Sequence, residues 1–367
     1  MVAVVVAVAV AVAVVVVAVT DMVTNNHTRL VLQFHITGRC NLRCKHCYRT
    51  KGDVEPLSLS QIIEVMEQFK ELQRAYYAKW GIKAKGHINI TGGEPFMRED
   101  IDEILTYLGE NRQSFTYGVL SNGSFIDEDM MALLKQTGVS FVQLSIDGDQ
   151  PTHDALRAKG DYERVFGVAQ TLEENGIATY ISFTAHQGNY QHLPLVAKEC
   201  RKRKVTKLWS DRMVPIGNGE QLQAMEITEK ELPLYLKALK KAQGNWLTKG
   251  LHKKTTVTMN RALQFQNSKG VVYSCSGGNR LITVDEEGNI MPCRRMPIVC
   301  GNVTKTTLSQ VYFQNEIFQQ LRLPTIPKEC GDCRYRFLCQ GGAKCQSYAK
   351  TGSFFSADPG CPFRNKT

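Results

Sequence analysis

Three cysteines stand within eight residues, at Cys40, Cys44 and Cys47, shortly after the apolar run 30–36. Thiolates are soft ligands that suit zinc, copper or iron–sulfur clusters. A structural zinc ion takes four ligands, whereas a cubane cluster held by three cysteines leaves one iron open. The C-x3-C-x2-C spacing therefore favours an iron–sulfur cluster with an open iron. A zinc knuckle or three unrelated buried cysteines are the alternatives.

This spacing resembles that of the radical S-adenosylmethionine (radical SAM) enzymes. In that family the open iron binds the amino and carboxylate groups of S-adenosylmethionine. One electron from the cluster then cleaves the sulfonium to a 5′-deoxyadenosyl radical, which abstracts hydrogen from a substrate. The resemblance implies a [4Fe–4S] cluster on Cys40, Cys44 and Cys47, with an electron donor such as flavodoxin or ferredoxin. It assigns no catalytic acid or base.

The elements that must position this loop follow from the pattern of the chain. Six apolar runs read as strands, at 30–36, 87–91, 116–120, 141–146, 178–183 and 207–214. Amphipathic stretches with helical spacing separate them, at 59–76, 101–111, 127–136, 162–175 and 193–203. Alternation of this kind predicts an α/β fold with a parallel sheet and right-handed crossovers. Six units are too few for a closed eight-stranded barrel, so we expect an open, partial (β/α)6 TIM-like barrel.

Chemistry in such sheets gathers at the carboxyl ends of the strands. The second run ends in Gly92-Gly93-Glu94, where paired glycines permit close backbone approach and Glu94 can accept charge-assisted hydrogen bonds. This resembles the family's GGE segment, which holds the methionine amino group. On its own, Gly-Gly-Glu-Pro also makes an ordinary turn.

Polar residues follow the next two strands as well. They are Ser121 and Asn122 after the third run, and Ser145 and Asp147 at the end of the fourth. The resemblance implies that they bind the ribose and the methionine carboxylate. Arg157 is similar to the arginine that pairs with the cosubstrate carboxylate in related maturases, and a surface salt bridge is its alternative.

A second concentration of cysteines lies in the last hundred residues, beyond a long stretch in which Cys200 is the only cysteine. It resembles the SPASM extension of radical SAM proteins, which houses one or two auxiliary [4Fe–4S] clusters. The resemblance gives the distal cluster four ligands, Cys330, Cys333, Cys339 and Cys361. A zinc ribbon is the alternative for four of these cysteines.

The proximal cluster departs from the family pattern. Cys275 and Cys293 match two of its ligands, but the third position is Ala343. The nearest thiol is Cys345, and Cys300 has no assigned role. We predict that Cys275, Cys293 and Cys345 hold a proximal cluster.

These motifs divide the chain into four parts. Residues 1–21 form a Val/Ala tract that we exclude from the fold, and residues 22–220 form the radical SAM barrel. Residues 221–268 read as a helical bridge. Residues 269–367 form a small, irregular α+β cysteine-rich iron–sulfur domain of the SPASM type.

Composition limits the environment and the partners. The net charge of +10 is dispersed apart from a run between Lys198 and Lys207, which reads as a solvated helix end and not as a nucleic-acid site. Clustered cysteines in a chain of this size indicate metal binding in a reducing cytoplasm. The Val/Ala tract is long enough to span a bilayer. It lacks a basic region before it and close aromatic anchors, so we expect no membrane association.

Most SPASM enzymes modify ribosomally made peptides, so we expect a peptide maturase that forms a crosslink or thioether or epimerises a residue. A separate leader-recognition protein could bring the peptide. Sulfatase maturation is set aside because Arg294 stands where those enzymes have an aspartate. The second interpretation is oxidative modification of a haem-precursor tetrapyrrole, since Gln340–Ala343 and the following Ser-Tyr-Ala-Lys-Thr-Gly resemble the signature of such relatives. A zinc-stabilised nucleic-acid-binding protein is the non-enzymatic alternative.

Overall fold

The computed structural model describes residues 27–49, 56–244, 255–267 and 272–364. The Val/Ala tract lies outside the described residues. Within them, no helix is both long and apolar enough to cross a membrane.

A single ten-stranded sheet organises the molecule, and its central strands are the six predicted ones. They are β1 (His27–Thr37), β2 (Lys83–Gly92), β3 (Phe115–Leu120), β4 (Val142–Ser145), β5 (Thr179–Ala185) and β6 (Lys207–Arg212). All five ladders between consecutive members are parallel. The predicted α/β fold with a partial parallel barrel is confirmed.

Four short strands extend this sheet at its two edges. β7 (Thr256–Thr258), inside the predicted helical bridge, pairs parallel with β6. β8 (Leu281–Val284) pairs parallel with β1, and β9 (Asn289–Met291) and β10 (Gly301–Asn302) continue the sheet antiparallel. The strand order runs from β10 to β7, so among the described residues the two edges are not hydrogen-bonded to each other. The barrel is open, and the β8–β9 hairpin, with Gly288 in its turn, is part of its sheet.

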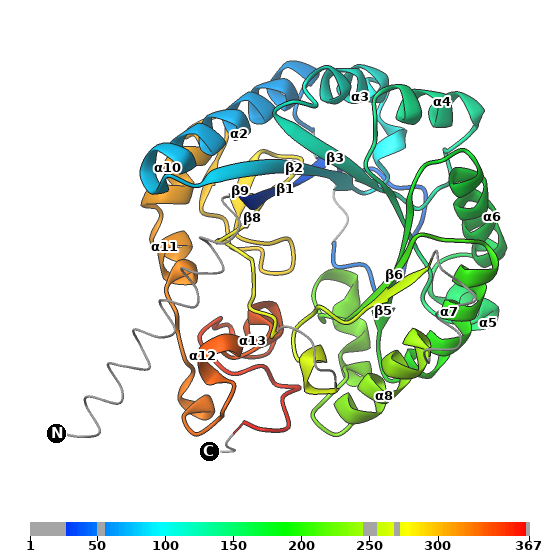
Figure 1. Ribbon diagram of the computed structural model, residues 1–367, viewed down its shortest axis with the longest axis vertical. Coiled ribbons are helices and arrows are strands. Elements are labelled where there is room, and N and C mark those ends of the chain that lie inside the picture. The colour runs from blue at the N-terminus through cyan, green and yellow to red at the C-terminus, as the bar shows by residue number, and fades with distance from the viewer. Residues whose placement is uncertain (1–26, 50–55, 245–254, 268–271, 365–367) are drawn as a thin grey trace.

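Helices cover the outer side of the curved sheet (Figure 1). The predicted ones are α2 (Leu59–Trp80), α3 (Ile101–Glu110), α4 (Glu128–Gln136), α6 (Asp161–Glu174) and α7 (Leu193–Lys202). The structure adds α5 (Gln150–Leu156) after β4, and α8 (Leu232–Gln243) packs against α7. Four 3-10 segments occupy the loops of this part, η1 (Pro95–Met97), η2 (Tyr190–His192), η3 (Gly217–Met225) and η4 (Gln264–Asn267).

The C-terminal elements lie beside the open side of the barrel (Figure 1). They are α10 (Leu308–Gln314), α11 (Glu316–Arg322), η5 (Lys328–Cys330), α12 (Arg336–Cys339) and α13 (Lys344–Thr351). An ion pair between Arg49 of the cysteine loop and Glu286 of the β8–β9 turn joins the first barrel loop to the C-terminal part of the chain.

Side chains alternate strictly between the two faces of the sheet. On β1 the outward set, from Leu30 through Leu32 and Phe34 to Ile36, is at most 1% exposed beneath the helices. The inward set includes Arg29 and Gln33, which line a cavity inside the barrel. Period-two alternation explains the apolar outer layer. A polar inner face differs from the packed apolar interior of a closed barrel and leaves room for a polar ligand.

Candidate active site

The cysteine triplet opens onto a cavity of about 220 Å³ at the carboxyl ends of the strands. We call it the triplet cavity, because Cys40, Cys44 and Cys47 all line it. Burial raises the pKa of the Cys40 and Cys44 thiols, and the neighbouring cysteines add to that effect. Thiols that raise one another's pKa lie close together, so they are placed to bind the same cluster.

Gly92 and Gly93 also line the triplet cavity, and the structure gives a packing reason for them. A Cβ on Gly92 would lie 2.2 Å from the carbonyl oxygen of Thr37, and one on Gly93 would lie 2.0 Å from that of Arg39. The amide of Gly93 donates to Thr37 O at 2.8 Å, and that of Glu94 donates to Arg39 O at 2.8 Å. The glycines therefore let the end of β2 dock against the cysteine loop.

Glu94 is fully buried and is not among the residues that line the triplet cavity. Its carboxylate accepts hydrogen bonds from the Phe96 amide, the Ser121 hydroxyl and the Asn122 amide, at 3.2, 2.9 and 2.7 Å. Burial raises the pKa of Glu94 to about 7 despite these bonds. In this arrangement Glu94 ties the end of β2 to the end of β3. Its role toward an ammonium group stays a prediction.

Arg157 and Asp147 meet beside the triplet, as their positions after β4 allow. Arg157 donates from Nε to Asp147 Oδ2 at 2.7 Å, and its Nη1 lies 3.7 Å from Cys44 Sγ. His46 Nε2 lies 3.2 Å from Asp147 Oδ2. Burial alone would raise the pKa of Asp147, but Arg157 and His46 hold it well below its usual value. This network delivers a fixed positive charge to a cluster ligand, and Arg157 lines the triplet cavity.

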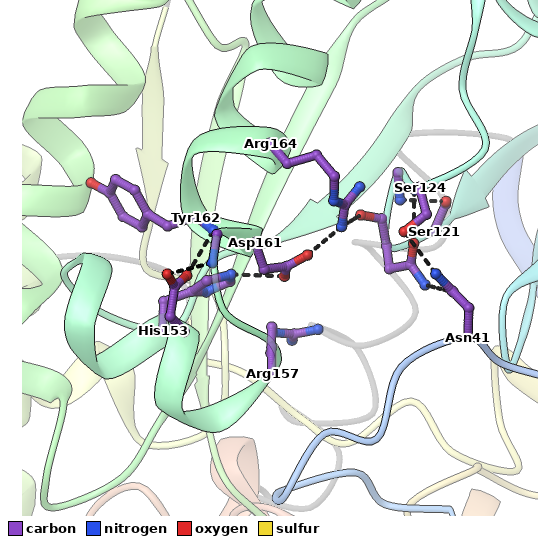
Figure 2. Close-up of polar contacts among 12 residues, drawn as sticks. Asn41, Ser121, Ser124, His153, Arg157, Asp161, Tyr162 and Arg164 are labelled. Carbon is purple, nitrogen blue, oxygen red and sulfur yellow. Dashed lines mark hydrogen bonds and ion pairs between the residues drawn. The ribbon is translucent and has the colours of Figure 1, made fainter.

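A second polar chain fixes the other side of the cysteine loop (Figure 2). Asn122 Nδ2 donates to Asn41 Oδ1 at 2.8 Å, and Asn41 donates to Ser124 Oγ at 3.0 Å. Arg164 donates to the Asn122 carbonyl at 3.1 Å and pairs with Asp161, which in turn holds His153. Sequence reasoning missed these α5 and α6 residues, because only the fold brings them to the loop.

Ser145 faces the triplet cavity from β4, where its hydroxyl lies 3.1 Å from that of Ser182 on β5. Of the eight residues predicted to bind the cosubstrate, six line this cavity: Gly92, Gly93, Ser121, Asn122, Ser145 and Arg157. Glu94 and Asp147 are not among the lining residues, but Glu94 accepts hydrogen bonds from Ser121 and Asn122, and Asp147 pairs with Arg157.

A second cavity, here called the barrel cavity, continues from the first into the barrel interior. The two share Leu120, Gln143, Trp209, Arg294 and Arg295. Cys275, Cys293 and Cys345 all line the barrel cavity, and desolvation raises the pKa of the Cys345 thiol, with Cys293 and Cys275 adding to that effect. The structure thus brings these three thiols together. Cys300 lies elsewhere, with its thiol 3.4 Å from the Ile298 carbonyl.

The four distal cysteines line one small pocket together with apolar side chains such as Leu263 and Phe265. Burial raises the pKa of Cys330 to about 11 and that of Cys339 to about 12, with Cys361 adding to both. Free thiols with such pKa values stay protonated at neutral pH, whereas bound iron stabilises the thiolate.

These donor sets fit iron–sulfur clusters. Three or four soft thiolates converge on each of three places, and the first of them opens onto a cavity. Within the described residues, no group of His, Cys, Asp or Glu is arranged to hold a single metal ion.

Comparisons with known proteins agree with this geometry. A family model described as the radical SAM superfamily matches residues 34–198, and one described as SPASM, an iron–sulfur cluster-binding domain, matches residues 275–334. The AdoMet-dependent heme synthase of Oleidesulfovibrio alaskensis is 26% identical over 361 residues, covering 91% of this chain and 87% of the relative. The Fe-coproporphyrin III synthase of Methanosarcina barkeri is 24% identical, covering 90% and 87%. The PqqA peptide cyclase of Granulibacter bethesdensis is also 24% identical, covering 89% and 85%.

Two solved structures share the fold. Streptococcus suis SuiB bound to S-adenosylmethionine superposes with a TM-score of 0.68 at 17% identity, over 94% of this chain and 80% of that one. The protein anSMEcpe with bound AdoMet gives 0.69 at 18% identity, over 92% and 94%. The chain therefore belongs to the radical SAM superfamily and carries a C-terminal SPASM domain, and its cofactors are S-adenosylmethionine, a [4Fe–4S] cluster and auxiliary clusters.

Proposed function

We propose that this enzyme oxidatively modifies a side chain of a carboxylate-rich tetrapyrrole, a haem precursor. The observation that carries the proposal is the charge of the two joined cavities. Six arginines and no carboxylate line the triplet cavity, and Asp211 is the one acid among the residues lining the barrel cavity. Four of the six arginines, Arg49, Arg157, Arg212 and Arg295, are paired with acids, which leaves Arg43 and Arg294 without an ion pair in the described residues. A cationic interior selects an anionic substrate, because buried cations are costly unless paired.

The names of the relatives support the same chemistry. The heme synthase and the Fe-coproporphyrin III synthase match about nine-tenths of this chain, and both names refer to iron tetrapyrroles. When bound, the first cluster and S-adenosylmethionine supply a radical that takes a hydrogen atom from the substrate. The chain's own part is to hold the substrate carboxylates and to keep water from the reacting carbon.

Arg294 is well placed for the first of these tasks. Its guanidinium carbon lies 5.2 Å from the centre of the Tyr48 ring, and it lines both cavities. Burial lowers its pKa, and the adjacent Arg295 lowers it further. Arg295 is neutralised by Asp211, with Nη1 2.6 Å from Oδ2, whereas Arg294 forms no ion pair within the described residues. A substrate carboxylate at Arg294 would lie between the cysteine triplet and the second group of thiols, Cys275, Cys293 and Cys345.

A ribosomally made peptide is the second candidate. The PqqA peptide cyclase matches nearly as much of this chain, at a similar identity. The same cationic cavities would accept the acidic side chains of such a peptide.

The test uses anaerobically purified protein with S-adenosylmethionine and a low-potential reductant. Iron coproporphyrin III or a glutamate-rich peptide is then added, and 5′-deoxyadenosine and substrate mass are followed by mass spectrometry. We expect the porphyrin to stimulate 5′-deoxyadenosine formation and to lose mass from its side chains. Stimulation by the peptide alone would establish the second candidate and refute the first.

A further inference from the structure

Three cations from three different parts of the fold line the barrel cavity. They are Arg29 near the start of β1, Lys207 at the start of β6 and Arg261 in the loop after β7. Arg29 is exposed, and the other two are half-buried. Burial lowers the pKa of Lys207, and Arg261 and Arg29 lower it further. Lys207 is therefore close enough to Arg29 and to Arg261 to be repelled by each of them.

Among the described residues, Asp211 is the one carboxylate that lines this cavity; burial alone would raise its pKa, but both Arg295 and Arg261 lower it. None of the three cations forms an ion pair within that part of the chain, and Asp211 is engaged by Arg295. Arg261 Nε is buried without a hydrogen-bond partner. Gln33, which is 5% exposed and lines the same cavity, has an unpartnered side-chain nitrogen. Unpaired buried donors are costly, so their gathering at one place indicates a ligand that accepts hydrogen bonds.

Flat aromatic surface lies beside these donors. The His87, Phe141 and Tyr180 rings stack in sequence, with centroids 5.5 and 4.3 Å apart. Lys207 Nζ lies 5.0 Å from the Tyr180 centroid, and the Arg261 guanidinium lies 4.3 Å from that of Trp209. Such a wall suits a ligand that is both aromatic and anionic.

We propose that Arg29, Lys207 and Arg261 form a carboxylate-binding subsite in the barrel cavity, which extends from the amino-terminal ends of β1 and β6 to Trp209. It holds the non-reacting carboxylates of the substrate while another side chain points toward the cysteine triplet. The inference rests on the proposed function and specifies how the substrate is oriented. Eight residues of β1, at about 3.3 Å each, separate Arg29 from Thr37 at the cysteine loop. The Arg29 end of the subsite is therefore roughly 26 Å from the loop along the strand, whereas Arg261 packs on Trp209, which also lines the triplet cavity. A subsite of this extent calls for a large substrate.

Equilibrium dialysis of the anaerobically purified full chain tests the subsite without turnover. The probes are coproporphyrin III, its tetramethyl ester and a glutamate-rich peptide. We expect the porphyrin acid to bind far more tightly than the ester, and to bind more weakly as salt rises. Lys207→Met and Arg261→Gln should each weaken binding by roughly ten- to a hundredfold, the effect of one charge-assisted hydrogen bond.

Two matched variants control the experiment. Lys240→Met removes an exposed lysine from α8 and should leave binding unchanged. Lys207→Arg keeps the charge and should bind within a fewfold of wild type, and circular dichroism checks that every variant is folded.

The outcomes separate the subsite from the proposed function. Equal affinity of wild type, Lys207→Met and Arg261→Gln for the porphyrin acid overturns the subsite and leaves the tetrapyrrole function standing. The same conclusion about the subsite follows if the ester binds as tightly as the acid. If only the peptide binds, with the expected loss in both variants, the subsite holds and the tetrapyrrole function fails. No binding of any probe to wild type overturns the subsite.

Discussion

Asp358 should be indispensable for the C-terminal cysteine sites, and its replacement by alanine offers a quantitative test. Its carboxylate pairs in bidentate fashion with Arg212 at the end of β6, with Nη1 to Oδ1 at 2.9 Å. The two side chains are 0% and 3% exposed. The same carboxylate accepts the Ala343 amide at 3.0 Å and the Gly360 amide at 2.9 Å. Those amides lie within two residues of Cys345 and Cys361, so one side chain positions ligands of both C-terminal groups.

The cost of Asp358→Ala follows from these contacts. Removing one partner of a buried ion pair costs about 3–5 kcal/mol, because the other charge stays buried. Each amide left unpaired adds about 1–3 kcal/mol. The sum is comparable to the roughly 5–15 kcal/mol that stabilises a whole domain. We therefore expect the C-terminal segment to detach from the barrel and to release its iron.

The assay is iron quantitation together with anaerobic thermal unfolding. Glu71→Ala is the control, since it breaks the Arg74–Glu71 pair, whose side chains are 64% and 63% exposed. Such pairs contribute at most about 1 kcal/mol. Adding Arg212→Met to Asp358→Ala should restore part of the stability by removing the stranded charge, but not the part due to the two amides. Wild-type iron content in Asp358→Ala, with an unfolding temperature no lower than that of Glu71→Ala, would refute this reasoning.

Three further predictions concern individual side chains. Cys345→Ala should lose about four irons per chain and Cys300→Ala none, by iron quantitation; equal iron in the two variants would contradict the proximal assignment. The pKa of Glu94, about 7, lies above its unfolded value of 4.5, so its contribution to the free energy of unfolding falls by roughly 3 kcal/mol as pH rises through this window. The free energy of unfolding of Glu94→Gln should therefore rise relative to that of wild type between pH 5 and 8. A constant difference between the two free energies would count against a buried charge at Glu94. Arg157→Lys loses the donor to Cys44 and should lower the reduction potential of the first cluster in an EPR-monitored titration, whereas an unchanged potential would show that this contact does not tune the cluster.

The fold was predictable because its signals are local. Each of the six central strands is a short apolar run, and the helices between them show regular spacing. β7 has three residues and α5 has seven, so neither is long enough to produce a clear period. The pairing of β8 with β1 joins segments 250 residues apart, and no local pattern encodes it.

The cysteines and the strand-end motifs were also predictable, since type and spacing suffice to mark them. The hydrogen-bond partners of Glu94 were not predictable, because its three donors come from two different loops. The cations of the barrel cavity, Arg29, Lys207 and Arg261, were not predicted, although the alternation of polar and apolar residues along the strands indicated a polar interior. Arg29, Gln33 and His87 occupy the inward positions of strands whose outward positions are apolar. Polar residues at every second position of a barrel strand indicate a lumen that binds a ligand.

The central claim is that the loop from Cys40 to Cys47 is where S-adenosylmethionine is cleaved. Its most direct test changes Cys40, Cys44 and Cys47 together to alanine and measures 5′-deoxyadenosine under dithionite, with iron quantitation alongside. We predict that the variant forms no 5′-deoxyadenosine while it keeps the iron of its C-terminal sites. Continued formation of 5′-deoxyadenosine by the triple variant would contradict the account.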